Sequence, residues 1–302
     1  MMNMKSGNKL SGSKKKFAEK LERKVSQAIL KYRLASKKDR IAVGVSGGKD
    51  STAVLYILKK LGYNVEAITI DVLMGKYTAQ NLDNIRKFCK QQGIKLHVVS
   101  FRQKIGCSVC YALASLKSKG HKLKSCTVCG VIRRYLLNKE ARRIGAAAVV
   151  TGHNLDDEAQ TILMNLLKNR MTLNLRISPK PGVVKDSRFV PRIKPLFFIP
   201  EKDIERYSKL RNFPVVYIRC PCGIESARAG VRKFLDEYEK ISPGIKQKIV
   251  SNFLKLLPKL KKKFAGSKDA KQAKMQHCAN CGEPSTQKIC RVCQMLENLK
   301  SP

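Results

Sequence analysis

The stretch IAVGVSGGKDS, residues 41–51, decides the fold class. Its first half is a short apolar run that predicts a buried strand, and a helical pattern follows its second half. Between them, Gly47 and Gly48 allow backbone N–H groups to approach an anion closely, and Ser46 and Ser51 add hydroxyl donors. The helix that follows directs the positive end of its dipole at this loop. The stretch therefore predicts a phosphate-binding loop at the end of a strand.

The loop does not follow the commonest phosphate-binding pattern, G-x4-G-K-[ST]. Here Lys49 is followed by Asp50, and the residue five positions before Gly48 is Val43 rather than Gly. A carboxylate in this place suits Mg²⁺, a cation that prefers carboxylate and phosphate oxygen. We therefore expect a nucleotide site of a different class, with Asp50 placing the magnesium ion.

Short apolar runs alternate with helical patterns along most of the chain. The predicted strands cover 41–45, 65–71, 96–100, 147–151 and 215–218. The predicted helices cover 50–61, 78–92, 131–144, 156–168 and 228–240, with another at about 244–261. Such alternation predicts an α/β fold, with a doubly wound, mostly parallel sheet.

We expect three regions in the chain. Residues 1–35 form a basic tail and an amphipathic helix, residues 36–265 form the nucleotide-binding domain, and residues 276–296 form a small metal-binding module. The Pro-containing stretch 170–200 is expected to be irregular, and irregular segments of that length usually serve a function.

The composition indicates a polyanionic partner. Lysine and arginine total 62 against 22 acidic residues, a formal net charge of +40. Self-repulsion on this scale favours a protein that meets nucleic acid. The chain contains no run of eighteen apolar residues, and its basic N-terminus lacks the apolar stretch of a signal peptide. We expect a cytoplasmic protein with no membrane segment.

Eight of the eleven cysteines fall in four C-x2-C pairs. In a reducing compartment this spacing is typical of metal ligands or redox thiols rather than disulfides. The C-terminal pairs, C-x2-C-x8-C-x2-C, predict a structural zinc site on Cys278, Cys281, Cys290 and Cys293. Cys107, Cys110, Cys126 and Cys129 read C-x2-C-x15-C-x2-C, and that spacing by itself also fits zinc.

A second polar motif, TGHNLDDEAQT at 151–161, follows the strand predicted at 147–151. Gly152 permits close backbone approach, and carboxylates stand at Asp156, Asp157 and Glu158. Simple capping of the next helix is the structural alternative. Its place at the carboxyl end of a parallel strand favours a ligand-binding role.

These motifs together resemble a known family. S-G-G-x-D-S is the PP-loop of ATP pyrophosphatases, which adenylate a substrate oxygen and release pyrophosphate. TGHNLDDEAQT, CTVCGVIRRYLLNKEARRIGA, FVPRIKPL and RCPCG resemble, in the same order, tRNA 2-thiolation enzymes of the archaeal and eukaryotic cytosolic type. The resemblance covers roughly residues 20–265 and the C-terminal cysteines. Family members often carry an N-terminal cysteine zinc module; no cysteine precedes Cys89 in this sequence, so we do not expect that module here.

The resemblance implies an ATP site, with magnesium, and a catalytic set. Asp157 is the expected acid or base, and Arg133 joins it. The residues expected to contact ATP are Gly44, Val45, Ser46, Gly47, Gly48, Lys49, Asp50, Ser51, Ile70, Gly152 and Asp157.

The resemblance also implies a 4Fe–4S cluster on Cys126, Cys129 and Cys220, with an iron open to exogenous sulfur. Cys222, two residues beyond Cys220, departs from the family pattern and could exchange with it as the third ligand. Zinc on Cys107, Cys110, Cys126 and Cys129 is the competing interpretation.

By resemblance, the protein is a tRNA uridine 2-sulfurtransferase. ATP adenylates O2 of uridine, and sulfur then displaces AMP at C2. The wobble uridine is the first expectation; the T-loop uridine and an anticodon-loop cytidine are alternatives.

The expected partners are tRNA, a sulfur donor (sulfide, persulfide or a ubiquitin-like thiocarboxylate protein) and a second copy in a homodimer. A ligase such as lysidine synthetase shares the loop but not the cysteines, and a non-catalytic tRNA-binding scaffold is the alternative from another class.

Overall fold

The computed structural model describes residues 12–121, 123–181, 186–218, 220, 227–265 and 275–300. A parallel sheet lies at its centre, in the order β3-β2-β1-β4-β5. Its strands are β1 (Arg40–Gly44), β2 (Asn64–Asp71), β3 (Leu96–Ser100), β4 (Ala148–Val150) and β5 (Arg192–Ile193). All four pairings are parallel, so the carboxyl ends of the strands share one edge of the sheet. This confirms the predicted fold class.

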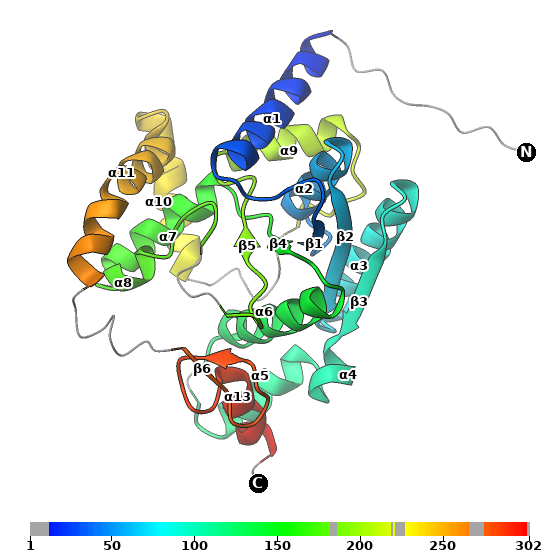
Figure 1. Ribbon diagram of the computed structural model, residues 1–302, viewed down its shortest axis with the longest axis vertical. Helices are drawn as coiled ribbons and strands as arrows, with labels where there is room; N and C mark the ends of the chain where they lie inside the picture. The colour runs from blue at the N-terminus through cyan, green and yellow to red at the C-terminus, as the bar shows by residue number, and fades with distance from the viewer. Residues whose placement is uncertain are drawn as a thin grey trace, which may run out of the picture.

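Both faces of the sheet are covered by helices (Figure 1). On the N-terminal side and in the centre these are α1 (Gly12–Lys31), α2 (Lys49–Lys60), α3 (Gly75–Gln91), α4 (Phe101–Ile105), α5 (Val109–Ser118) and α6 (Ser125–Arg143). The later helices are α7 (Leu155–Leu167), α8 (Met171–Asn174), α9 (Glu201–Leu210), α10 (Ala227–Ile241) and α11 (Ile245–Ala265). Helices α7, α8, α10 and α11 form a group to one side of the sheet in Figure 1.

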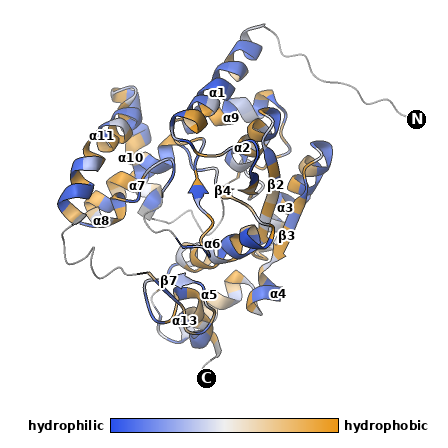
Figure 2. Ribbon diagram, in the orientation of Figure 1, coloured by the Kyte–Doolittle hydropathy of each residue, from blue (hydrophilic) through white to orange (hydrophobic). Residues whose placement is uncertain are grey.

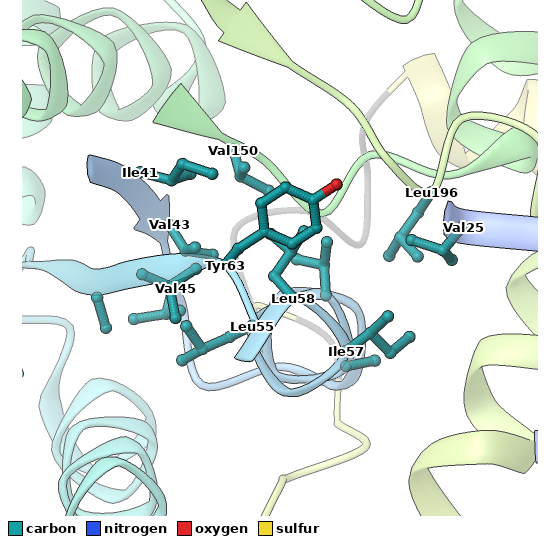
Figure 3. Close-up of a cluster of buried hydrophobic side chains, with 14 of the residues drawn as sticks. Val25, Ile41, Val43, Val45, Leu55, Ile57, Leu58, Tyr63, Val150 and Leu196 are labelled. Carbon is teal, nitrogen blue, oxygen red and sulfur yellow. The ribbon is translucent and has the colours of Figure 1, made fainter. Parts of the chain in front are cut away.

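The pleat of β1 explains how the two layers form. Ile41, Val43 and Val45 belong to one buried cluster, in which they lie beside Leu55 and Leu58 of α2 (Figure 3). Ala42 points the other way, into a second cluster. Strand residues alternate between faces, so a strand that is apolar on both faces is buried between two helical layers.

Helix α6 covers the second face. Val128, Ile132 and Leu136 are buried at four-residue spacing, as in a helix with one apolar stripe. Charged residues, among them Arg133, Arg134 and Lys139, stand between these positions, and the ribbon of α6 alternates between hydrophilic and hydrophobic colours in Figure 2. This places the first turn of α6, with Cys126 and Cys129, next to the sheet.

A small C-terminal unit packs against α5 and α6 (Figure 1). It contains β6 (Gln276–His277), β7 (Pro284–Ser285) and α13 (Arg291–Lys300). Arg142 of α6 forms an ion pair with the buried Glu283 of this unit, and Asn138 Nδ2 donates to the same carboxylate at 3.3 Å. Polar contacts thus hold the unit on the helix that carries Cys126 and Cys129.

Three expectations about the elements are corrected. The predicted strand at 215–218 is wrong: Tyr217 and Ile218 are exposed, and no strand is formed there. The fifth strand is instead β5, inside the stretch expected to be irregular, because it pairs with β4 at Val149 and Val150. The helix predicted at 131–144 begins earlier, at Ser125, and so includes the cysteine pair.

None of the helices in the described residues is long and apolar enough to cross a membrane.

Candidate active site

The phosphate-binding loop lies between β1 and α2, as predicted. Gly47 has φ of +78°, and a Cβ atom there would lie 2.7 Å from the carbonyl oxygen of Asn81 in α3. Both the conformation and the contact require glycine. Gly48 is the N-cap of α2, and no side chain caps the helix. The first N–H groups of α2 are therefore available to an anion.

Ser51 holds the loop in shape. Its Oγ accepts from the backbone N–H of Ser46 at 3.2 Å and donates to the carbonyl of Gly48 at 3.1 Å. The hydroxyls of Ser46 and Ser51 lie 3.4 Å apart. Gly44 and Val45 lead into this loop, and Val45 N donates to Ile68 of β2. Ile70 is buried at the end of β2, on the same edge of the sheet.

Charged groups alternate in sign around the loop. Lys49 Nζ lies 3.1 Å from Asp50 and 2.7 Å from Glu201 at the start of α9. Asn154 Nδ2 donates to Asp50 Oδ1 at 3.1 Å. Burial raises the pKa of Asp50; Lys49 opposes this, while Asp157 and Glu201 add to it. Carboxylates whose charges repel in this way are natural ligands for a hard cation such as Mg²⁺.

The second motif brings Asp157 to the loop. Asn154 caps α7 in a capping box, in which Asn154 Oδ1 accepts from Asp157 N and Asp157 Oδ2 accepts from Asn154 N. Asp157 therefore caps α7 and also lies close enough to the loop to raise the pKa of Asp50. Burial raises the pKa of Asp157, and Arg228 at 3.6 Å is the strongest opposing influence.

The two motifs touch through a glycine. A Cβ atom at Gly152 would lie 2.8 Å from Ser51 N and 3.0 Å from the carbonyl carbon of Asp50. Only a residue without a side chain allows the β4 motif to lie directly against the phosphate-binding loop.

The neighbouring carboxylates have structural roles instead. Asp156 Oδ1 accepts from Lys246 of α11 at 2.6 Å, and its Oδ2 accepts from Glu201 N at 2.7 Å. Glu158 pairs with Lys194 at 2.7 Å. Of the three carboxylates in the motif, Asp157 alone faces the loop, and the other two tie α7 to α9, α11 and the segment after β5.

His153 stands among cations at the end of β4. Surrounding protein, followed by Lys194, Arg228, Arg192 and Arg134, lowers its pKa to about 3. His153 is partly accessible to solvent, but its lowered pKa keeps the imidazole neutral at physiological pH. Its Nδ1 lies 2.9 Å from the hydroxyl of Thr151.

The cysteines expected to hold iron come from two segments of the chain. Cys126 lies in the first turn of α6, and Cys129 follows three residues later in the same helix. Burial raises the pKa of Tyr77 in α3; Cys220 adds to this and Arg133 opposes it, so both residues lie near Tyr77. Arg133 Nε is buried with no hydrogen-bond partner among the described atoms. Cys222 lies outside the described residues.

One compact group of metal-ligand atoms occurs in the described part of the chain. The sulfur atoms of Cys278, Cys281, Cys290 and Cys293 all lie within 4.8 Å of one another. Burial opposes ionisation of Cys278, but backbone N–H groups of Cys290, Cys281 and Asn280 lower its pKa to about 6. Four sulfur donors on two tight turns fit tetrahedral zinc. Within the described ranges, Cys107 and Cys110 do not join Cys126 and Cys129 in such a group, and neither does Cys220.

Sequence reasoning missed several residues of the site. Glu201, Lys194 and Arg228 come from segments far along the chain. Helix α9 brings Glu201 to the loop, while the segment after β5 and helix α10 bring Lys194 and Arg228 to the second motif. Their positions depend on the three-dimensional fold. The motif FVPRIKPL, which contains Arg192 and Lys194, was the one local signal.

The model of the PP-loop domain family matches residues 17–218. A tRNA-5-methyluridine(54) 2-sulfurtransferase of Pyrococcus horikoshii is 34% identical over 92% of this chain and 85% of its own length. A cytoplasmic tRNA 2-thiolation protein 1 of Saccharomyces cerevisiae is 30% identical over 94% of this chain and 79% of its own.

A solved structure shares the fold. The U34-tRNA thiolase NcsA from Methanococcus maripaludis, determined with its [4Fe-4S] cluster, superposes with a TM-score of 0.77 and 28% identity. The match covers 96% of this chain and 90% of that one. The chain therefore belongs to the PP-loop family, in the branch that contains the tRNA 2-sulfurtransferases and the cytoplasmic tRNA 2-thiolation proteins.

Proposed function

We propose that this protein is an ATP-dependent tRNA uridine 2-sulfurtransferase. The observation that carries the proposal is the direct contact between the phosphate-binding loop and the β4 motif at Gly152, which brings Asp50 and Asp157 to one site. This pairs an anion-binding helix end with two carboxylates for magnesium, as adenylation requires.

In the first step ATP and the target uridine react. The uracil O2 attacks the α-phosphorus of ATP, the bond to the pyrophosphate oxygen breaks, and pyrophosphate leaves. The N–H groups of Gly48 and the first turn of α2 would hold the pyrophosphate. Lys49 and magnesium on Asp50 would neutralise its developing charge, and Asp157 would take the proton released from the base.

In the second step sulfur replaces the activated oxygen. A sulfur nucleophile forms the C2–S bond, and AMP leaves with the former O2. Cys126, Cys129 and Cys220 would hold the iron–sulfur cluster, which supplies an iron that can bind the incoming sulfur. Arg133 would stabilise negative charge near these cysteines; its buried Nε, which has no hydrogen-bond partner among the described atoms, supports this role.

The donor set fits such a cluster in its chemistry. Cysteine thiolates bind iron–sulfur clusters, and Cys126 and Cys129 stand three residues apart near the start of α6. NcsA, which shares the fold, carries a [4Fe-4S] cluster. The four C-terminal cysteines would hold a separate zinc ion that stabilises the small unit.

The wobble uridine is our proposed target, supported by the fold shared with a U34-tRNA thiolase. The 34% identity to an enzyme acting on 5-methyluridine 54 favours the T-loop as the second candidate. We further propose a cytoplasmic location, a homodimer as the expected assembly, and sulfide, persulfide or a thiocarboxylate protein as the sulfur donor. With a persulfide donor, a second thiol would have to cleave its S–S bond and leave as a disulfide.

The test is an anaerobic reaction of the reconstituted protein with ATP, sulfide and unmodified tRNA. We expect 2-thiouridine by mass spectrometry of the nucleosides, with one AMP and one pyrophosphate formed for each sulfur. Digestion into oligonucleotides then places the sulfur in the anticodon loop or the T-loop. Tight tRNA binding without any thiolated nucleoside would instead support the non-catalytic scaffold.

A further inference from the structure

Arg192 occupies an edge strand and points at the layer of α6. Its register partner in β4 is Val149, and parallel partners share a face of the sheet. Val149 and Val190 belong to the cluster that α6 covers, whereas Ile193 belongs to the opposite cluster. The Arg192 side chain therefore lies on the α6 side, next to the carboxyl edge of the sheet.

Arg134 of α6 lies close enough to Arg192 to affect its pKa. Asn138, one turn later in α6, donates to Arg188 O at 2.9 Å and accepts from Val190 N at 3.0 Å, which ties the segment before β5 to this helix. The Arg134 side chain runs back along α6, so that its Nη1 lies 3.2 Å from the position of a Cβ at Gly130. The guanidinium thus lies in the turn that holds Cys126 and Cys129.

Neither arginine has a carboxylate partner in the described parts of the chain. The three carboxylates of the β4 motif pair with Lys194, Arg228 and Lys246 instead. Burial, followed by repulsion from Arg134, lowers the pKa of Arg192 to about 10. Arg134 is exposed and Arg192 is half-buried, so water screens part of their repulsion, and Cys129 opposes the lowering of the Arg134 pKa. No carboxylate among the described residues neutralises the pair, so part of the repulsion remains in the unliganded protein. Such an arrangement is explained when a bound anion completes it.

A third arginine continues the positive charge. Burial and then the charge of Arg291 lower the pKa of Arg134. Arg291 is the first residue of α13 and is exposed, in the C-terminal unit that packs on α6. Arg192, Arg134 and Arg291 therefore form a track from the sheet edge to the surface, which we call the arginine track.

We propose that Arg134 and Arg192 bind a backbone phosphodiester of the tRNA beside the target nucleotide, and that Arg291 binds a neighbouring phosphate. This rests on the proposed function. The ATP phosphates have their own cradle in the uncapped start of α2 with Lys49, and a triphosphate does not need a track that extends to a separate unit. A polynucleotide backbone does, because its charges repeat along the chain.

The test compares the reconstituted wild-type protein with Arg134→Gln, Arg192→Gln and, as the control, Arg86→Gln. Arg86 is an exposed arginine of α3 with one distant ion pair to Asp83. Each track variant should weaken tRNA binding about tenfold, and should reduce the slope of log affinity against log salt by about 0.7 to 0.9. The dissociation constant for ATP should stay unchanged, and Arg86→Gln should match wild type.

A second measurement locates the phosphate. We expect wild type to bind tRNA more weakly when a single neutral methylphosphonate replaces one particular phosphate near the target nucleotide. Arg192→Gln should lose no further affinity when that same phosphate is replaced.

A melting experiment checks that the variant folds. Arg192→Gln should melt at a higher temperature than wild type, since the repulsion between Arg192 and Arg134 is removed.

Unchanged tRNA affinity in both track variants, or a loss of ATP affinity in place of tRNA affinity, would overturn the proposal. Thiolation by wild type is measured in the same reactions. If wild type forms no thiolated nucleoside but the salt and methylphosphonate effects hold, the proposed function fails and the phosphate site stands.

Discussion

Gly152 lies so close to Ser51 that a Cβ atom would come within 2.8 Å of the Ser51 backbone nitrogen. The two residues belong to different motifs, which follow the neighbouring strands β4 and β1. The contact is between backbone atoms, so no side-chain movement can relieve it. The geometry of the ATP site therefore depends on the absence of a single methyl group.

We predict that Gly152→Ala displaces the phosphate-binding loop. The affinity for ATP, measured by calorimetry, should fall tenfold or more, and the free energy of unfolding should fall by about 1–3 kcal/mol, as in overpacked cores. Gly230→Ala in α10 is the matched control, because nothing lies within 4 Å of its Cβ position. That change should leave ATP binding intact and stabilise the helix by about 0.5–1 kcal/mol. Equal ATP affinity in both variants would contradict this account of the site.

Asp50→Ala tests the magnesium assignment. The variant should lose tRNA-dependent release of pyrophosphate, because Asp50 is the loop carboxylate beside Lys49 and Asn154. tRNA binding should remain, since one carboxylate changes little in a protein with a net charge of +40. A variant that releases pyrophosphate at the wild-type rate would show that the loop does not act in adenylation.

Asp157 provides a prediction about pH. Burial raises its folded pKa above the unfolded value of about 3.9. The folded state therefore holds the proton more tightly, and this stability is lost as the pH rises through the folded pKa. Asp157→Asn keeps an oxygen for the capping box but does not titrate. Its melting temperature relative to wild type should be lowest near pH 4 and should increase toward neutral pH.

Calorimetric scans across this range check the prediction, with Asn154→Ala as the comparison. That change removes the cap of α7 and should lower stability at every pH, since no titrating group is lost. A parallel shift for both variants would mean that Asp157 has only its capping role.

The sequence predicted those parts of the fold and site that local patterns encode. SGGKDS and TGHNLDDEAQT each follow a strand, and the carboxyl ends of parallel strands meet at one edge, so their proximity could be foreseen. The C-terminal cysteines were equally clear from their spacing alone.

The rest depends on long-range packing. β5 has two residues and no alternation to detect, and its pairing with β4 became visible only in three dimensions. The apolar run at 215–218 looked like a strand, but Tyr217 and Ile218 lie at the surface. Likewise Glu201, Arg228 and Lys246 reach the second motif through contacts between helices, which sequence spacing does not reveal.

The last prediction concerns the metals. Anaerobically reconstituted protein should be brown and contain both iron and zinc. Cys126→Ala should remove the colour and thiolation but leave the zinc, because the four C-terminal sulfur atoms form a separate group. Cys278→Ala should lose the zinc and loosen the unit that Glu283 holds on α6.

Cys107→Ala decides between the two models. Under the cluster model this variant should keep the iron. The model with zinc on four cysteines predicts two zinc ions and no iron in wild type, with one zinc ion lost in this variant. Metal analysis by mass spectrometry of wild type and the three variants checks this. Two zinc ions and no iron in wild type after reconstitution would exclude the cluster mechanism.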